Sequence, residues 1–172
     1  MQHTMFYPVM SRPCLLVLSL LLWLATPALA APPEGYRFLP LGDAARQASN
    51  EGKPMFLYFG RYGCSTCRKM EAEVFSDAAL AERLNAGFVL AYVDTESGER
   101  IRLGSGEVIS EMQYAARNRI LGTPTFVFIS PEQKPLFKKA GFQSIAQMHQ
   151  YADYILDDHF RSMPLAEFVT AQ

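Results

Sequence analysis

The chain has 172 residues and a formal net charge of −1, from 16 Lys and Arg against 17 Asp and Glu. This length allows one domain with a substantial core. Both charge signs are mixed along the sequence without a basic block, which argues against nucleic acid or a membrane surface as a binding partner.

The first thirty residues have the features of a signal peptide. Arg12 is their only charge, an apolar run follows at 14–24, and Ala28-Leu29-Ala30 gives the small-x-small pattern of a cleavage site. The apolar run is shorter than the roughly 20 residues that span a bilayer. We therefore predict a cleaved signal peptide at 1–30. Retention as an uncleaved N-terminal anchor is the alternative.

Cleavage would leave a single domain at 31–172 in a compartment where thiols are oxidised by default. Its net charge would be −2, and of the three cysteines Cys14 would be lost, leaving Cys64 and Cys67. Ala31 to Gly35 is expected to be a short flexible lead. The next expected elements are an edge strand at 36–41, a helix from Asp43 as N-cap to about Asn50, and a buried central strand at 54–59.

The motif Cys64-Ser65-Thr66-Cys67 follows this strand and opens a helical stretch. Two thiols at i and i+3 lie on one face of the first turn, close enough for a disulfide. The helix N-terminus stabilises a thiolate on Cys64, so the pair can open and close by exchange with another disulfide.

The same pair of cysteines could also be half of a zinc site or a static disulfide. A closed zinc site needs four ligands, and the remaining histidines, His149 and His159, lie on a distant stretch. A purely structural disulfide across so short a loop would constrain the unfolded chain little. We therefore expect redox chemistry, with no metal and no cofactor.

The second half continues the alternation of helices and strands. After a second helical segment at 78–85 we expect a buried strand at 88–93, a polar loop or insertion at 95–108, and a helix from a Ser110 capping box to about Asn118. A strand at 126–129, a turn at 130–133, an antiparallel strand at 134–139, a helix over 145–156 and a short helical tail complete the chain. This order predicts an α/β fold whose sheet has a parallel section covered on both faces and ends in a hairpin.

With these motifs in place, the sequence resembles thioredoxin-fold proteins over nearly all of residues 36–160. C-S-T-C after F-L-Y-F-G, the later T-P-T-F-V-F, and Gly141 carry the resemblance. G-K-P-M-F-L-Y-F, C-x-x-C-x-x-M and V-F-S-D resemble the C-terminal periplasmic domain of the membrane transporter that keeps exported thiols reduced. The stretch from Gly106 to Thr125 resembles periplasmic thioredoxins found with bacterial sulfur-oxidation proteins.

The resemblance implies a mixed central sheet with helices on both faces, and it implies residue roles. Cys64 would be the attacking thiol and Cys67 the resolving thiol, while Thr123 and Pro124 would form the cis loop opposite them that binds substrate. Two departures stand out: the strand 55–59 lacks the buried acid of thioredoxins, with Tyr58 near its place, and Gly63 replaces a tryptophan.

These features together predict a periplasmic thiol–disulfide oxidoreductase that reduces protein disulfides through Cys64 and Cys67. The expected partners are exported proteins with disulfides and a membrane electron donor of the transporter type, and no nucleic acid. The alternative is a copper chaperone or a non-catalytic binding module. Copper-delivering relatives tend to have a wider cysteine spacing and a nearby histidine, and this sequence has neither.

Overall fold

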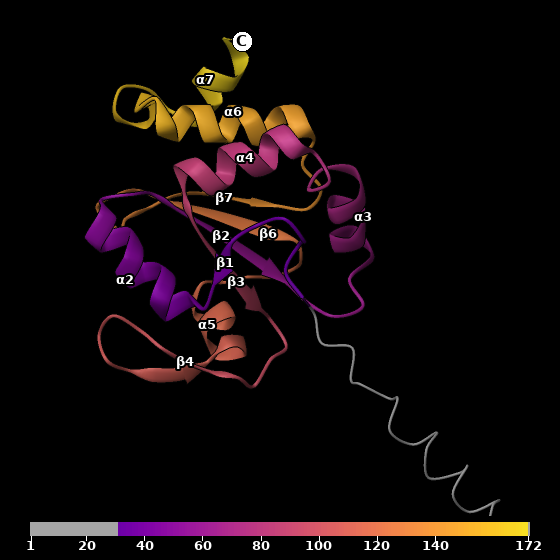
Figure 1. Cartoon of the computed structure of the whole chain (residues 1–172), viewed down its shortest axis with the longest axis vertical. Helices are drawn as coiled ribbons and strands as arrows, with labels where there is room; N and C mark the ends of the chain where they lie inside the picture. Colours follow the sequence, from indigo (N-terminus) through magenta and orange to yellow (C-terminus); the bar gives the residue numbers. More distant parts are fainter. Residues whose placement is uncertain (1–30, 172) are drawn as a thin grey trace, which may run out of the picture.

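A computed structural model describes residues 31–171 (Figure 1). The strands are β1 (Phe38–Leu39), β2 (Met55–Gly60), β3 (Val89–Asp94), β4 (Arg100–Arg102), β5 (Val108–Ser110), β6 (Thr125–Ile129) and β7 (Pro135–Ala140). The helices are α2 (Leu41–Glu51), α3 (Ser65–Glu73), α4 (Ala78–Gly87), α5 (Glu111–Arg117), α6 (Ile145–Leu156), the 3-10 turn η2 (His159–Arg161) and α7 (Leu165–Thr170).

A five-stranded sheet with the order β1-β3-β2-β6-β7 forms the centre of the molecule. β1 and β2 both run parallel to β3, while β6 is antiparallel to β2 and to β7. β2, which leads into the cysteine motif, therefore lies in the middle of the sheet and is buried along its whole length.

The side chains of β2 alternate between two separate cores, as the two-residue period of a strand requires. Phe56 and Tyr58 join the core under α3, α4, α6 and α7, whereas Met55, Leu57 and Phe59 join the core under α2 and α5. Helices thus cover both faces of the sheet (Figure 1). The predicted α/β class with a mixed central sheet is confirmed.

The stretch predicted as a polar loop at 95–108 contains the first strand of a small hairpin. β4 pairs antiparallel with β5 in a second sheet, and the only well-buried side chains of these strands are Ile101 and Ile109. Both isoleucines pack into the core under α2 and α5. The prediction missed the hairpin because each strand is three residues long and carries so little apolar signal.

The predicted start of the first helix was also wrong. The backbone N–H of Asp43 already donates to the carbonyl of Pro40, so Asp43 lies inside the first turn instead of capping it. Its carboxylate pairs with Arg46 instead. The predicted Ser110 capping box on α5 is present, with Gln113 as its second member, and Asp77 caps α4.

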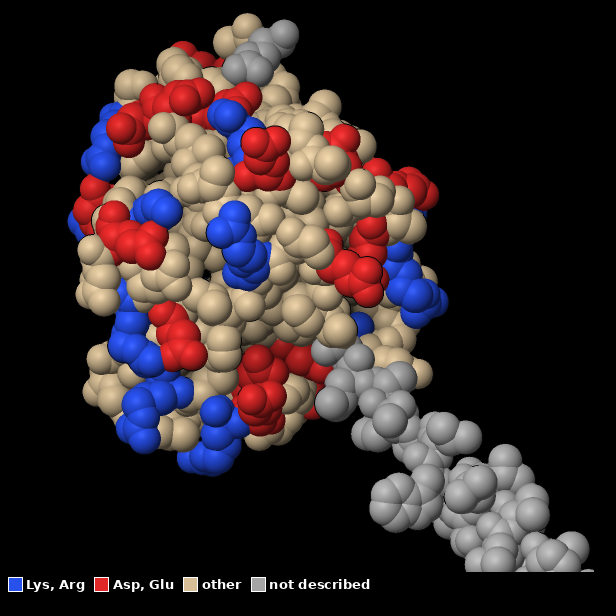
Figure 2. All heavy atoms as spheres, in the orientation of Figure 1, with Lys and Arg blue, Asp and Glu red and all other residues tan. Residues whose placement is uncertain are grey.

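The face drawn in Figure 2 carries acidic and basic side chains side by side, with apolar and neutral surface between them. None of the helices between residues 31 and 171 is long and apolar enough to cross a bilayer. The predicted signal peptide at 1–30 lies outside the described residues.

Candidate active site

The two cysteines of the motif meet where β2 gives way to α3. Cys64 is the N-cap of α3 and Cys67 lies in its first turn, with their Cα atoms 5.2 Å apart and their sulfurs joined in a disulfide. The backbone N–H of Cys67 donates to Sγ of Cys64 over 3.1 Å. This N–H is one of the free donors at a helix start, and it would stabilise negative charge on Cys64 after reduction.

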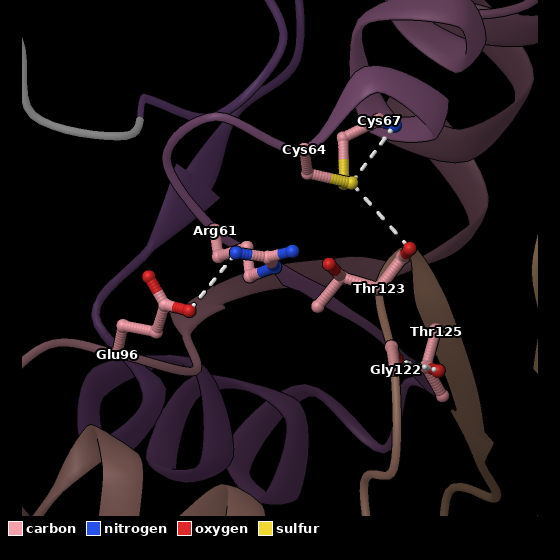
Figure 3. The surroundings of a disulfide bond; sticks show 7 residues. All are labelled: Arg61, Cys64, Cys67, Glu96, Gly122, Thr123 and Thr125. Carbon is pink, nitrogen blue, oxygen red and sulfur yellow. Dashed lines mark hydrogen bonds and ion pairs between the residues drawn. A yellow bond between two sulfur atoms is a disulfide. The ribbon is translucent and has the colours of Figure 1, made fainter.

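The loop with the predicted substrate residues lies directly opposite the disulfide. The Thr123–Pro124 peptide is cis, and the carbonyl oxygen of Thr123 lies 3.4 Å from Sγ of Cys64 (Figure 3). Two bonds fix the loop: Thr125 Oγ1 donates to Gly122 O over 2.7 Å, and Gly141 N donates to Pro124 O over 2.8 Å. The structure thus brings all four predicted site residues together.

A cavity of about 600 Å³ opens beside the disulfide. Cys64 and Cys67 line it together with side chains of α3 and with the N-terminal segment Ala31–Glu34. Pro33 of this segment is buried. Ala31 to Gly35 was predicted to be a short flexible lead, and no pattern in this proline-containing stretch indicates that it packs beside the cysteines.

Glu71 is an acid of this cavity that was not predicted from the sequence. It follows Cys67 by one helical turn on α3, which places both side chains on one face of the helix. Burial raises the pKa of its carboxyl above the usual range, against an opposing effect of Arg68. The C-x-x-C-x-x-x-E spacing was the available signal.

The one cation on the loop between β2 and Cys64 is already paired. Arg61 Nη1 donates to Glu96 Oε1 over 3.0 Å, as Figure 3 shows, and both side chains are about half exposed. The cavity lining contains no histidine. The other cation of the lining, Arg68, shares it with the carboxyls of Glu34 and Glu71, and the direct contact that a thiolate on Cys64 would receive is the Cys67 N–H at the helix start.

Tyr58 lies near the position where thioredoxins have a buried acid, and it is a core residue. Its side chain is fully buried among aromatic rings, including Phe75 and Phe126, and does not line the cavity. Burial raises the pKa of its phenol well above the ordinary value. It is thus poorly placed to accept a proton from Cys67.

Within residues 31–171, no group of three or more His, Cys, Asp or Glu side chains is arranged to hold a metal ion. His149, one of the two histidines considered as ligands, lies 3.9 Å from Asp77 at the start of α4. Its partner is thus a helix-capping carboxylate and not a cysteine.

A disulfide at a helix N-terminus, facing a cis-proline loop on a mixed sheet, defines a thiol–disulfide oxidoreductase of the thioredoxin fold. The family model for a thioredoxin-like domain matches residues 41–156, about two thirds of the chain. The chain belongs to the thioredoxin-like domain family. No curated protein matches it.

Solved structures of the same fold include a thioredoxin from Thermus thermophilus, 27% identical over 70% of this chain and 87% of that chain, with a TM-score of 0.58. A thioredoxin-fold protein from Helicobacter pylori is 20% identical over 70% of this chain and 82% of its own, with a TM-score of 0.65. A DsbH oxidoreductase is 19% identical over 77% and 90%, with a TM-score of 0.56.

Proposed function

We propose that this protein reduces disulfides of exported proteins in the periplasm and draws its electrons from a membrane dithiol donor. The observation that carries the proposal is the Cys64–Cys67 disulfide at the start of α3, with Sγ of Cys64 3.4 Å from the Thr123 carbonyl. The predicted signal peptide at 1–30 supports the location. The similarity to a thioredoxin supports disulfide exchange.

The reaction would proceed in two exchanges. The Cys64 thiolate attacks one sulfur of the substrate disulfide, whose S–S bond breaks and whose other sulfur leaves as a thiolate that takes a proton. The Cys67 thiolate then attacks Sγ of Cys64, which releases the second substrate thiol and closes the Cys64–Cys67 disulfide. Two electrons pass to the substrate, and a dithiol donor must return two to the protein.

We infer the reductive direction from the small number of positively charged groups that could stabilise the Cys64 thiolate of the reduced protein. A strongly oxidising dithiol protein owes its potential to a reduced form that is stabilised by favourable contacts. Here Arg61 is paired with Glu96, and the cavity beside the cysteines is lined by one further cation, Arg68, and by two acids, Glu34 and Glu71. We therefore expect a potential nearer the roughly −270 mV of thioredoxin than the roughly −120 mV of the strong oxidant.

A glutathione redox titration, followed by the mass shift of alkylated protein, measures this potential. Insulin reduction with an artificial dithiol donor, before and after chelator treatment, tests catalysis and the expected independence of metal. A midpoint close to the strong oxidant's value would replace the reductase with an oxidase or isomerase. Activity that only zinc or copper restores would favour the metal-binding alternative.

A further inference from the structure

Gln143 is a long polar side chain buried between β7 and α6. The buried polar residues among residues 31–171 are Thr125, Ser130 and Gln143, which is 7% exposed. Thr125 and Ser130 bury only a hydroxyl, whereas Gln143 buries a whole amide. Burial of an amide costs free energy unless its donors and its acceptor are hydrogen-bonded, so the partners of Gln143 indicate what it does.

Both ends of the Gln143 amide have partners. Nε2 donates to the carbonyl oxygens of Ala140, Gly141 and Phe142 over 3.2, 3.2 and 2.9 Å, and Oε1 accepts from the hydroxyl of Tyr151 over 2.9 Å. Three carbonyl oxygens around one end of an amide require the nitrogen at that end, which fixes its orientation. The amide thus holds three consecutive carbonyls in place. We call residues 140–143 the Gln143 turn.

The Gln143 turn is bonded to the loop that faces the disulfide. The N–H of Gly141, in the middle of the turn, donates to the carbonyl of Pro124 over 2.8 Å. The carbonyl of the preceding residue, Thr123, lies 3.4 Å from Sγ of Cys64 (Figure 3). The position of the turn therefore sets how close the Thr123–Pro124 loop lies to the reactive sulfur.

The same turn is attached to the helix that carries the cysteines. The backbone N–H of Gln143 donates over 3.2 Å to Sδ of Met70, a fully buried side chain of α3 that follows Cys67 by three residues. Nζ of Lys69, also on α3, lies 4.6 Å from the centre of the Phe142 ring, a cation–π contact. The Gln143 turn therefore joins α3 to the Thr123–Pro124 loop.

We propose that Gln143 is a positioning residue that holds the Thr123–Pro124 loop against the dithiol, so that a peptide disulfide meets Cys64 in the reactive geometry. This inference rests on the proposed disulfide exchange, in which that loop contacts the substrate. Gln143 does not line the cavity beside the cysteines, so it acts through the loop. Such an effect can be large, because a displacement of about 1 Å at a reacting centre can cost about 100-fold in rate.

The test compares two disulfides in Gln143→Met, which keeps an unbranched side chain and removes the amide. Insulin presents its disulfides within a peptide backbone, whereas bis(2-hydroxyethyl) disulfide has no backbone that the loop could contact. The second-order rate constant for oxidation of the pre-reduced protein is measured with each. The insulin rate constant should fall about tenfold and the other should stay within about twofold of the wild type. A smaller folded fraction would lower both equally.

Two further variants separate positioning from stability. Gln143→Met leaves the Tyr151 hydroxyl without its acceptor, whereas Gln143→Met/Tyr151→Phe removes both partners and should recover part of the lost stability. The double variant should still be slower with insulin than Tyr151→Phe alone, in which the amide keeps its three carbonyls. Tyr154→Phe is the matched control, since this hydroxyl on the same helix donates to Met163 and not to the turn, and it should keep both rate constants. Equal losses with both disulfides, or an insulin rate that recovers in the double variant, would overturn the positioning role.

Hydrogen exchange of the Gly141 amide tests the same contact without any redox reaction. This N–H is bonded to the Pro124 carbonyl and should exchange about tenfold faster in Gln143→Met than in the wild type. Faster exchange in the variant, with a wild type that reduces neither disulfide, would support the hold of Gln143 on the loop and overturn the reductase. Unchanged exchange at Gly141, or faster exchange without a selective loss of the insulin rate, would overturn the positioning role.

Discussion

Cys64 and Cys67 differ little in exposure, at 6% and 4%, so depth alone does not decide which thiol reacts. The difference between them is electrostatic. Cys64 receives the free N–H of Cys67 at the helix start, which lowers the pKa of a thiol in that place. We therefore expect iodoacetamide, at limiting dose on reduced protein, to label Cys64 first in peptide maps. Preferential labelling of Cys67 would contradict the assignment.

Glu71→Gln should lower the pKa of the reactive thiol. A carboxylate in the cavity beside the cysteines disfavours a second negative charge, and an amide of the same shape does not. The measurement is the rate of alkylation of reduced protein against pH, whose midpoint should move down. Glu73→Gln is the control, since Glu73 lies on the same helix, is exposed and is near Lys69.

The same substitution has a stability consequence with a defined sign. Because the folded-state pKa of Glu71 is raised, its ionisation opposes folding. Glu71 therefore contributes most to the free energy of unfolding at a pH below its pKa in the unfolded chain. This contribution is lost as the pH rises through its pKa in the folded protein. Glu71→Gln should be more stable than the wild type at neutral pH in urea unfolding, with the difference vanishing toward pH 4. A variant less stable at pH 7 would contradict this.

Tyr58→Phe should stabilise the protein by about 1 kcal/mol. The phenol oxygen is fully buried without a hydrogen-bond partner among the described residues, and removal of such a group avoids its desolvation cost. Urea unfolding measures the gain, and disulfide exchange should stay at the wild-type rate. A slower exchange in Tyr58→Phe would show that the phenol hydroxyl takes part in proton removal from Cys67.

At the scale of elements, α2 comes within contact of the hairpin strand β4. A Cβ added to Gly42 would lie 2.5 Å from the backbone oxygen of Arg102, closer than real contacts allow. Gly42→Ala should therefore destabilise the protein by about 1–3 kcal/mol, the usual cost of overpacking, although alanine favours a helix. Gly104→Ala, which meets nothing within 4 Å, is the control and should change stability little. Unfolding midpoints in urea make the comparison.

The elements that the sequence predicts well are those with strong local signals. β2 is a continuous apolar run, and α5 and α4 begin at side chains that cap their own helices. The β4–β5 hairpin was missed because Ile101 and Ile109 become core residues only through packing under α2. A pattern of four to eight residues is needed to indicate a strand, and three-residue strands do not provide it.

In the candidate site, too, the residues with a local sequence signal were predicted and the others were not. The cysteines and the Thr123–Pro124 loop were identified by motifs that are contiguous in sequence. The wall of the cavity beside the cysteines includes Ala31–Glu34, a segment that is remote in sequence from the motif. No local pattern indicates which distant segments will meet, so these residues appear only in the structure.

At the scale of the whole molecule, redox state and folding stability are linked. If the protein is a reductant, its folded state favours the disulfide over the dithiol, and the oxidised form must be the more stable one. Guanidinium unfolding of both forms should therefore show a higher midpoint for the oxidised protein. The difference in unfolding free energy between the two forms should equal the difference in redox potential between the folded protein, from the glutathione titration, and the unfolded chain. About 1.4 kcal/mol corresponds to each 30 mV. A more stable reduced form would indicate an oxidant.

The packing of Ala31–Glu34 beside the cysteines ties the chemistry of the site to the maturation of the chain. Cleavage after Ala30 would create an α-amino group on Ala31, with an ordinary pKa of about 8, in the lining of the dithiol cavity. At neutral pH this group is mostly cationic, so processing would offset part of the negative charge that Glu34 and Glu71 bring to this lining. Cleavage at the predicted site would therefore make the N-terminus of the mature chain part of the electrostatic environment of Cys64.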